Sequence, residues 1–110
     1  MSQVLRLTER NFDQEVHQCQ TPVLVEFSAS WCVPSQQQKP LLRELAKEYN
    51  GKLSIGELNV DQNPRVAAEY RIMGCPTFIT FYSGKTIERR VGAQSKKQLI
   101  ELIQSAIDSH

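Results

Sequence analysis

The segment SASWCVPS at residues 28–35 places one cysteine, Cys32, between a tryptophan and a Val-Pro-Ser tripeptide. Two cysteines in a Cys-x-x-Cys arrangement form a redox-active dithiol, whereas the spacing here ends in Ser35. A serine hydroxyl can hydrogen-bond a thiolate, but it cannot form a disulfide. The segment therefore holds half of a redox dithiol, and its chemistry depends on the reactivity of Cys32.

The predicted position of Cys32 favours a reactive thiolate. A buried strand gives way to a helix near this residue, so the free N–H groups of the first helical turn point at its sulfur. Such a site stabilises negative charge by up to ~2 kcal/mol, and the thiolate is the reactive form. Trp31 shields one side, Pro34 holds the first turn, and the strand end is expected to leave the sulfur partly exposed. The alternative, a small buried hydrophobic residue, is the usual state of an isolated cysteine.

The elements that position this segment follow from the periodicity of the apolar residues. The predicted strands are 4–7, 22–30, 52–60, 76–82 and 85–91. The predicted helices are 11–19, 32–49, 62–72 and a C-terminal helix that follows Ser95. The continuous apolar run at 22–30 is typical of a strand buried on both faces. The alternation of strands and helices predicts an α/β fold in which helices cover both faces of a mixed sheet.

Local signals predict where the helices begin, bend and end. They are the capping boxes Asn11 with Gln14 and Ser95 with Gln98, a kink at Pro40, a left-handed Gly51, and the pair Asn63 and Pro64. The first helix is expected to bury Phe12, Val16 and Cys19 on one face, which makes Cys19 a core residue.

Composition bounds the class of protein. The chain has 110 residues, 40% hydrophobic and 23% charged, which predicts one globular domain spanning 1–110. A net charge of +1 with interspersed signs argues against nucleic acid and membrane surfaces as partners. We expect no signal peptide and no membrane span. Three cysteines are too few for a secreted disulfide framework, so a cytoplasmic location is expected.

Four segments in order and register resemble the thioredoxin family: VLVEFSASWCVP, LNVDQNP, YRIMGCPTF and FYSGKTIERRVGA. The resemblance covers essentially the whole chain. It implies the thioredoxin fold, with a central mixed five-stranded sheet flanked by four helices. It also implies protein disulfide reductase activity in cell redox homeostasis, with disulfide-containing proteins as substrates and a thioredoxin reductase as the reductant. A monomer without metal or cofactor is the corresponding expectation.

The resemblance also assigns roles to residues. Cys32 would be the nucleophile that attacks a substrate disulfide, and Ser35 occupies the position of the cysteine that resolves the mixed disulfide. Pro76 would be a cis-proline, which would leave the Cys75 backbone free to pair with an extended substrate. The residues expected to bind substrate are Trp31, Val33, Pro34, Gly74, Cys75, Pro76 and Gly92.

Ser35 and Val33 depart from the family pattern, which commonly has cysteine and glycine at these positions. Ser35 is either natural, in an atypical monothiol member, or an engineered Cys-to-Ser substitution. The intact substrate-docking features favour the engineered origin. Because Ser35 cannot resolve the mixed disulfide, two alternatives to disulfide reduction remain open. They are a polypeptide-binding module without turnover and an iron–sulfur carrier resembling monothiol glutaredoxins.

Glu26 and Cys75 are further departures. By resemblance Glu26 would replace a buried aspartate that assists proton transfer, and Glu57 stands where the family often has a lysine. Two carboxylates in one buried site would raise one pKa, unless Glu57 points elsewhere or Glu26 faces solvent. Cys75 could act as a substitute resolving thiol, but a packing residue that turns inward is the preferred interpretation.

Overall fold

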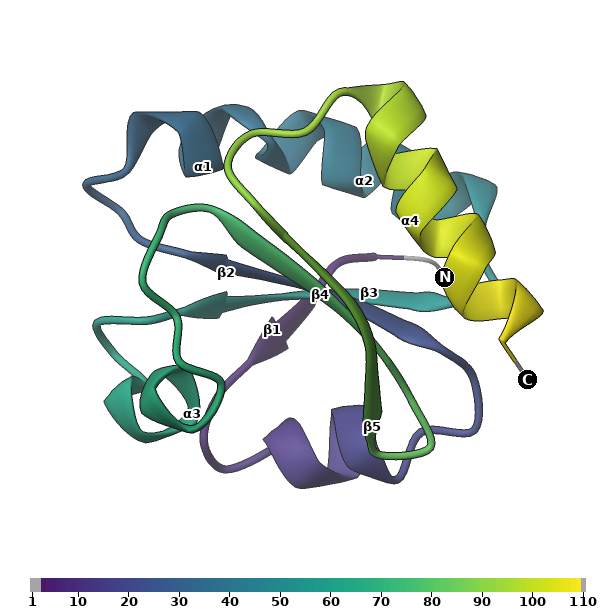
Figure 1. The fold of residues 1–110 in the computed structure, drawn as a ribbon, viewed down its shortest axis with the longest axis horizontal. Helices are drawn as coiled ribbons and strands as arrows, with labels where there is room; N and C mark the ends of the chain where they lie inside the picture. The colour runs from purple at the N-terminus through teal and green to yellow at the C-terminus, as the bar shows by residue number, and fades with distance from the viewer. Residues whose placement is uncertain (1–2, 110) are drawn as a thin grey trace.

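A five-stranded mixed sheet forms the centre of the computed structural model, which describes residues 3–109 (Figure 1). The strands are β1 (Leu5–Leu7), β2 (Val23–Ser28), β3 (Ser54–Asn59), β4 (Thr77–Tyr82) and β5 (Lys85–Val91). Their order is β1-β3-β2-β4-β5. The first three strands are parallel, whereas β4 runs antiparallel to β2 and β5 antiparallel to β4. This arrangement confirms the predicted mixed sheet.

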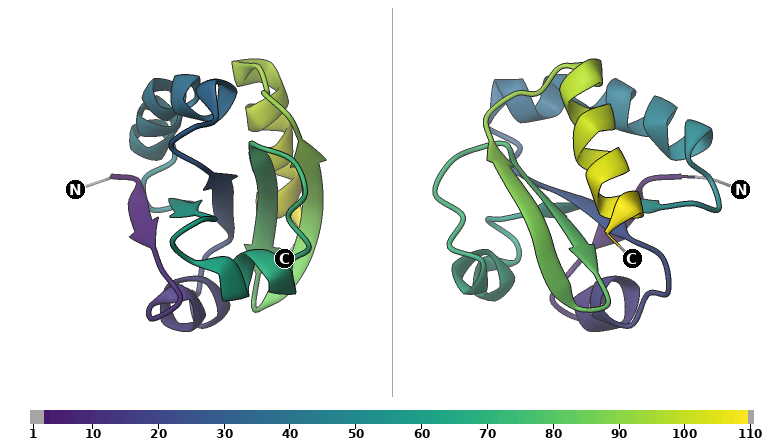
Figure 2. Two further views of the ribbon diagram at one scale, coloured as in Figure 1. Left: turned by 90° about the vertical axis from the view of Figure 1, so that its left-hand side faces the viewer. Right: turned by 45° about the vertical axis from the view of Figure 1, so that its right-hand side comes forward.

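Helices cover both faces of the sheet, as the alternation of elements predicted (Figure 2). They are α1 (Val33–Gln37), α2 (Lys39–Glu48), α3 (Pro64–Glu69), α4 (Lys96–Asp108) and a short π-helix, η1 (Asp13–His17). Figure 1 shows α1, α2 and α4 on one side and η1 and α3 on the other. Each side encloses its own hydrophobic core. No helix within residues 3–109 is long and apolar enough to cross a membrane.

Strand β2 is central in the sheet, and all six of its side chains are buried. Leu24 packs into the core beneath α2 and α4, while Val23, Val25 and Phe27 pack into the core beneath η1 and α3. The apolar run in the sequence therefore has the predicted cause, burial on both faces. Glu26 is the single ionisable residue in this strand.

The first predicted helix is wrong in its extent and in its cap. The structure forms only the five-residue η1, and the Asn11 side chain does not cap it. Asn11 Oδ1 instead accepts the Thr8 N–H at 2.7 Å, and the Thr8 carbonyl accepts the Phe12 N–H at 2.9 Å. The turn at Thr8 thus competes with the local capping signal. Cys19 lies beyond η1 and packs, partly buried, against the core, as expected.

The predicted helix 32–49 is interrupted at Gln38, just before Pro40. Pro40 has no N–H to donate to the preceding turn, so α1 ends and α2 begins there. The capping box of Ser95 with Gln98 is confirmed in both of its hydrogen bonds, and Gly51 has the left-handed φ of 87°. Asn63 occupies the N-cap position of α3, but its Oδ1 accepts the Glu9 N–H rather than a helical one.

Candidate functional site

Cys32 is the N-cap residue of α1, with the extended backbone angles φ −92° and ψ 101°. Its N–H donates to the Ala29 carbonyl at 3.1 Å, and its own carbonyl accepts the Gln36 N–H at 3.1 Å. These two bonds form the tight link between the end of β2 and the first turn of α1. The sulfur therefore lies at the start of the helix, where the sequence placed it.

The exposure of Cys32 differs from the expectation of a partly exposed sulfur. The residue is only 5% exposed, because the thiol of Cys75 and the turn at Ser35 contact its sulfur. Burial raises the pKa of Cys32. Hydrogen bonds from the Cys75 thiol and from the N–H and hydroxyl of Ser35 outweigh this effect and hold the pKa below its ordinary value. The site thus favours thiolate through its donors, despite its burial.

Ser35 is fully buried beneath the Cys32 loop. Its hydroxyl lies 2.9 Å from the Cys32 carbonyl oxygen and 3.1 Å from the Ala29 carbonyl oxygen, and can donate to either. Gln36 Nε2 donates to the same Ala29 oxygen at 2.8 Å. Ser35 consequently ties the end of β2 to α1 and also contacts the Cys32 sulfur.

Strand β4 brings the second half of the site beside Cys32. Phe27 of β2 pairs with Thr77 of β4, so the residues just before Thr77 lie next to the residues just after β2. The Cys75–Pro76 peptide bond is cis, as the family resemblance implied. The Pro76 carbonyl accepts the Gly92 N–H at 2.7 Å. The sheet therefore joins the Cys32 loop, the Cys75–Pro76 loop and Gly92.

Cys75 is partly buried, and its thiol is hydrogen-bonded to the sulfur of Cys32. Burial and this contact with Cys32 raise the pKa of Cys75 to about 11. Cys75 is absent from both hydrophobic clusters of the described residues, and its neighbours are Cys32, Ser35 and Ala29. The two thiols hence form a pair in which Cys75 holds the proton and Cys32 favours the negative charge.

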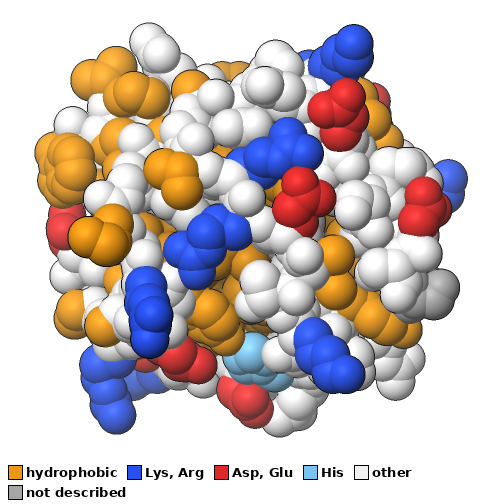
Figure 3. Space-filling model, in the orientation of Figure 1, with side chains coloured by type: hydrophobic (Ala, Val, Ile, Leu, Met, Phe, Trp, Pro, Cys, Tyr) orange, Lys and Arg blue, Asp and Glu red, His pale blue; other side chains and the backbone are white. Residues whose placement is uncertain are grey.

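Exposed apolar side chains surround this pair. Trp31 is 68% exposed and Met73 is 95% exposed, and Val33 and Val91 are also exposed. Figure 3 shows hydrophobic side chains gathered on the side of the molecule where α1 begins. Trp31 Nε1 donates to Asp61 at 2.7 Å, which holds the indole at the surface. Sequence reasoning missed Met73 and Val91, although both lie within segments that it had singled out.

Gly74 is required by the packing of this surface. A Cβ atom at this position would lie 2.7 Å from Cγ1 of Val91, which is closer than side-chain carbons approach. Gly92 has a φ of 96°, a left-handed conformation that favours glycine. These two glycines allow the Cys75–Pro76 loop and the end of β5 to approach each other.

Glu26 is fully buried, and neither of its carboxylate oxygens has a hydrogen-bond partner within the described residues. It pairs in register with Glu57 on β3, which places both side chains on the same face of the sheet. Burial raises the pKa of Glu26 to about 8; Lys39 opposes this shift and Glu57 adds to it. The solvent-facing alternative for Glu26 is therefore wrong.

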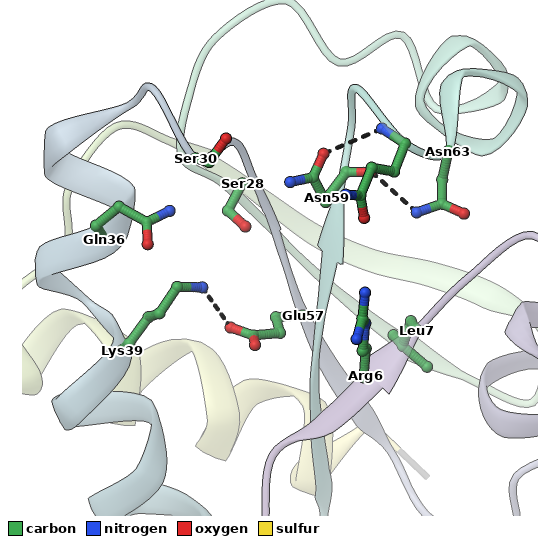
Figure 4. Close-up of a pocket in the computed structure, with 10 residues that line it drawn as sticks. Arg6, Leu7, Ser28, Ser30, Gln36, Lys39, Glu57, Asn59 and Asn63 are labelled. Atoms are coloured by element: carbon green, nitrogen blue, oxygen red, sulfur yellow. Dashed lines mark hydrogen bonds and ion pairs between the residues drawn. The ribbon is translucent and has the colours of Figure 1, made fainter.

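Lys39 is a site residue that sequence reasoning missed. Its Nζ lies 2.6 Å from Oε2 of Glu57, so this α2 lysine neutralises the second carboxylate (Figure 4). The pair borders a polar cavity of about 230 Å³ between α1, β1 and β3. The polar segment QQQK at residues 36–39 was the signal available in the sequence, but only the packing of α2 on β3 shows that Lys39 pairs with Glu57.

The comparisons with known proteins agree with this geometry. The sequence profile of the family described as Thioredoxin matches residues 3–105. The chain belongs to the thioredoxin family. It is thus a thioredoxin-type redox protein, and the family supports a disulfide oxidoreductase activity.

Individual thioredoxins match nearly the whole chain. The thioredoxin of Buchnera aphidicola subsp. Schizaphis graminum is 38% identical over 107 residues, which cover 97% of this chain and 99% of that protein. The thioredoxin of Staphylococcus saprophyticus is 41% identical over 102 residues, covering 92% and 95%. The chloroplastic M-type thioredoxin of Zea mays is 41% identical over 109 residues, covering 99% and 65%.

The buried acid of this thioredoxin should control how its stability depends on pH. The unfolded chain ionises Glu26 near its ordinary pKa of 4.5, whereas the folded chain keeps the proton until about pH 8. The loss of folding stability caused by the buried carboxyl group is therefore absent below pH 4.5, grows as the pH rises, and levels off above pH 8. Between these values each pH unit costs up to about 1.4 kcal/mol. We expect Glu26→Gln to remove this dependence of the free energy of unfolding on pH.

Urea unfolding of both forms from pH 4.5 to pH 8 measures the effect. The native chain should lose a few kcal/mol, on the order of 2–4, in its free energy of unfolding relative to Glu26→Gln across this range. Glu101→Gln, which removes an exposed carboxylate on α4, is the matched control and should give a curve parallel to that of the native chain. A parallel curve for Glu26→Gln would contradict the prediction.

Proposed function

We propose that this protein carries out thioredoxin-type exchange with protein disulfides and that Cys32 is its attacking thiol. The observation that carries the proposal is the set of donors at Cys32, which favour its thiolate although the sulfur is buried. The thiolate attacks one sulfur of a substrate disulfide. A bond forms between Cys32 and that sulfur, and the other sulfur departs as a thiolate.

The exposed apolar side chains around the site are proposed to hold the substrate. An extended polypeptide lies across Trp31, Val33 and Pro34 and pairs with the backbone at Cys75. Pro76, Gly74 and Gly92 shape the surface on which it rests. Glu26, whose pKa of about 8 lies close to neutrality, is proposed to exchange protons with the site.

Ser35 is proposed to slow the second step of the reaction. It occupies the position from which a cysteine releases the substrate in a Cys-x-x-Cys site, and its hydroxyl cannot attack a disulfide. The mixed disulfide at Cys32 should consequently persist longer than in a dithiol protein. The Cys-Val-Pro-Ser site then makes this an atypical thioredoxin. As a family member it is proposed to be reduced by a thioredoxin reductase.

Trapping of the mixed disulfide tests this proposal. The reduced protein is incubated with insulin, quenched with acid, separated on a non-reducing gel and mapped by peptide mass. We expect the trapped complexes to be attached through Cys32 and to disappear on reduction. Attachment through Cys19, or neither a complex nor oxidation of Cys32, would contradict the proposal. Binding of insulin without any covalent complex would instead favour the polypeptide-binding module.

A further inference from the structure

We propose that Cys75 is the second redox thiol of this site and resolves the mixed disulfide at Cys32 in place of Ser35. The inference rests on the proposed function, because it needs Cys32 to form a mixed disulfide first. It assigns a catalytic role to a residue on the loop before β4, outside the Cys-Val-Pro-Ser turn.

The register of the sheet places Cys75 against the Cys32 loop. Phe27 pairs with Thr77 in the antiparallel β2–β4 ladder, so the loop before β4, which carries Cys75, lies beside the loop that follows β2. Figure 1 shows these two loops at the same end of the sheet. The surroundings of its thiol agree, because Cys32, Ser35 and the Ala29 backbone all influence its pKa. Both residues are free thiols, and each one shifts the pKa of the other, which places the two side chains close together.

Cys19 cannot take this role in the described structure. Its sulfur lies 3.3 Å from Thr21 Oγ1 and 3.9 Å from Ser54 Oγ, at the start of β3. Parallel pairing sets Ser54 beside Val23, the first residue of β2, whereas Cys32 follows the last residue of that strand. The length of β2 therefore separates Cys19 from the site, and Cys75 is the one thiol that contacts Cys32.

The protonation of Cys75 changes in the direction that resolution requires. In the reduced protein, burial and contact with Cys32 raise the pKa of Cys75 to about 11, so its thiol is protonated and donates to Cys32. Once Cys32 enters a mixed disulfide, its sulfur carries no charge and no longer needs that donor. The influences of Ser35 and of the Ala29 backbone remain, and both lower the pKa of Cys75.

The reaction balances with a substrate disulfide as the oxidant. Cys32 thiolate bonds to one substrate sulfur, and the other leaves as a thiolate. Cys75 gives its proton to water or to that departing thiolate and then attacks the Cys32 sulfur. The bond between Cys32 and the substrate breaks, a Cys32–Cys75 disulfide forms, and the second substrate thiolate departs. The protein has lost two electrons to the substrate, and an external dithiol returns them.

An aromatic disulfide, 5,5′-dithiobis(2-nitrobenzoate), counts the two steps separately. One equivalent added to the reduced native protein should release two coloured thiolates per chain and leave no adduct. Peptide mapping should then find Cys32 linked to Cys75. With Cys75→Ser, one thiolate should be released and the adduct should remain on Cys32. Cys19→Ser, which changes a thiol outside the site, should behave like the native protein.

The rate at which the protein catalyses insulin reduction by dithiothreitol measures its turnover. Cys75→Ser should lower it by about tenfold and should increase the amount of trapped complex, because resolution within the chain is lost. Far-UV circular dichroism of the variant checks that it is folded. Release of one thiolate from the native protein, with Cys75 left free, would overturn the role of Cys75 alone. Release of none would overturn the proposed function.

Discussion

Cys32→Ser is expected to lower the rate of insulin reduction to that of dithiothreitol alone. This is a loss of about a thousandfold or more in the catalysed rate of exchange. The substitution keeps the size of the side chain and replaces the only sulfur that the site favours as a thiolate. Cys75 is not expected to substitute as the attacking group, because burial, the largest cause of its raised pKa, remains when Cys32 is replaced. Turbidity of reduced insulin chains measures the rate.

Two controls make this result specific to the site. Cys19→Ser removes a thiol that contacts Thr21 and Ser54 and should retain the native rate. Non-reducing gels of Cys32→Ser with insulin should show no covalent complex. Native turnover in Cys32→Ser would mean that another thiol attacks the substrate, and the proposed function would lose its nucleophile.

Ser35→Cys is expected to raise turnover by about tenfold or more and to remove most of the trapped complex. A thiol at this position lies in the same helical turn as Cys32 and is attached to the same rigid segment. Attack within one turn has a higher effective concentration of thiol than attack from the separate loop before β4, so release should be faster than through Cys75. Because Ser35 is fully buried and its hydroxyl already contacts the Cys32 sulfur, a thiol should reach it with little rearrangement.

The matched control is Ser35→Ala, which removes the hydroxyl without adding a thiol. It also removes one of the donors that favour the Cys32 thiolate, so its turnover should stay at or below the native rate. Peptide mapping of oxidised Ser35→Cys should find the disulfide within the 32–35 turn. If Ser35→Cys turns over no faster than the native protein, release is not the slow step and the impaired resolution proposed for Ser35 is wrong.

Much of this protein could be predicted from short segments of its sequence. The apolar run of β2 predicted a strand buried on both faces, and the alternation of elements predicted the mixed sheet. Ser95 with Gln98 predicted a capping box, which forms as expected. The position of Cys32 at a strand-to-helix junction was also visible. These features depend on neighbouring residues in the chain, and local patterns record them directly.

Local signals failed where a donor outside the expected helix competed. Asn11 has the residue type of a helix cap, but it bonds the Thr8 N–H instead. Asn63 stands at an N-cap position, yet its side chain accepts from Glu9. In both cases the side-chain oxygen has several donors within reach in the folded chain. The sequence pattern counts only the donor that is nearest along the helix.

Tertiary structure alone decided the chemistry around Cys32 and Glu26. The contact between Cys75 and Cys32 follows from the register of β4 on β2, and the pairing of Lys39 with Glu57 follows from the packing of α2 on β3. Neither contact has a periodic signature, because the partners lie on elements far apart in the sequence. The sequence determined which residues could react and the order of the elements along the chain. Sheet register and helix packing determined which of them meet, since these set the distances over which hydrogen bonds and charges act.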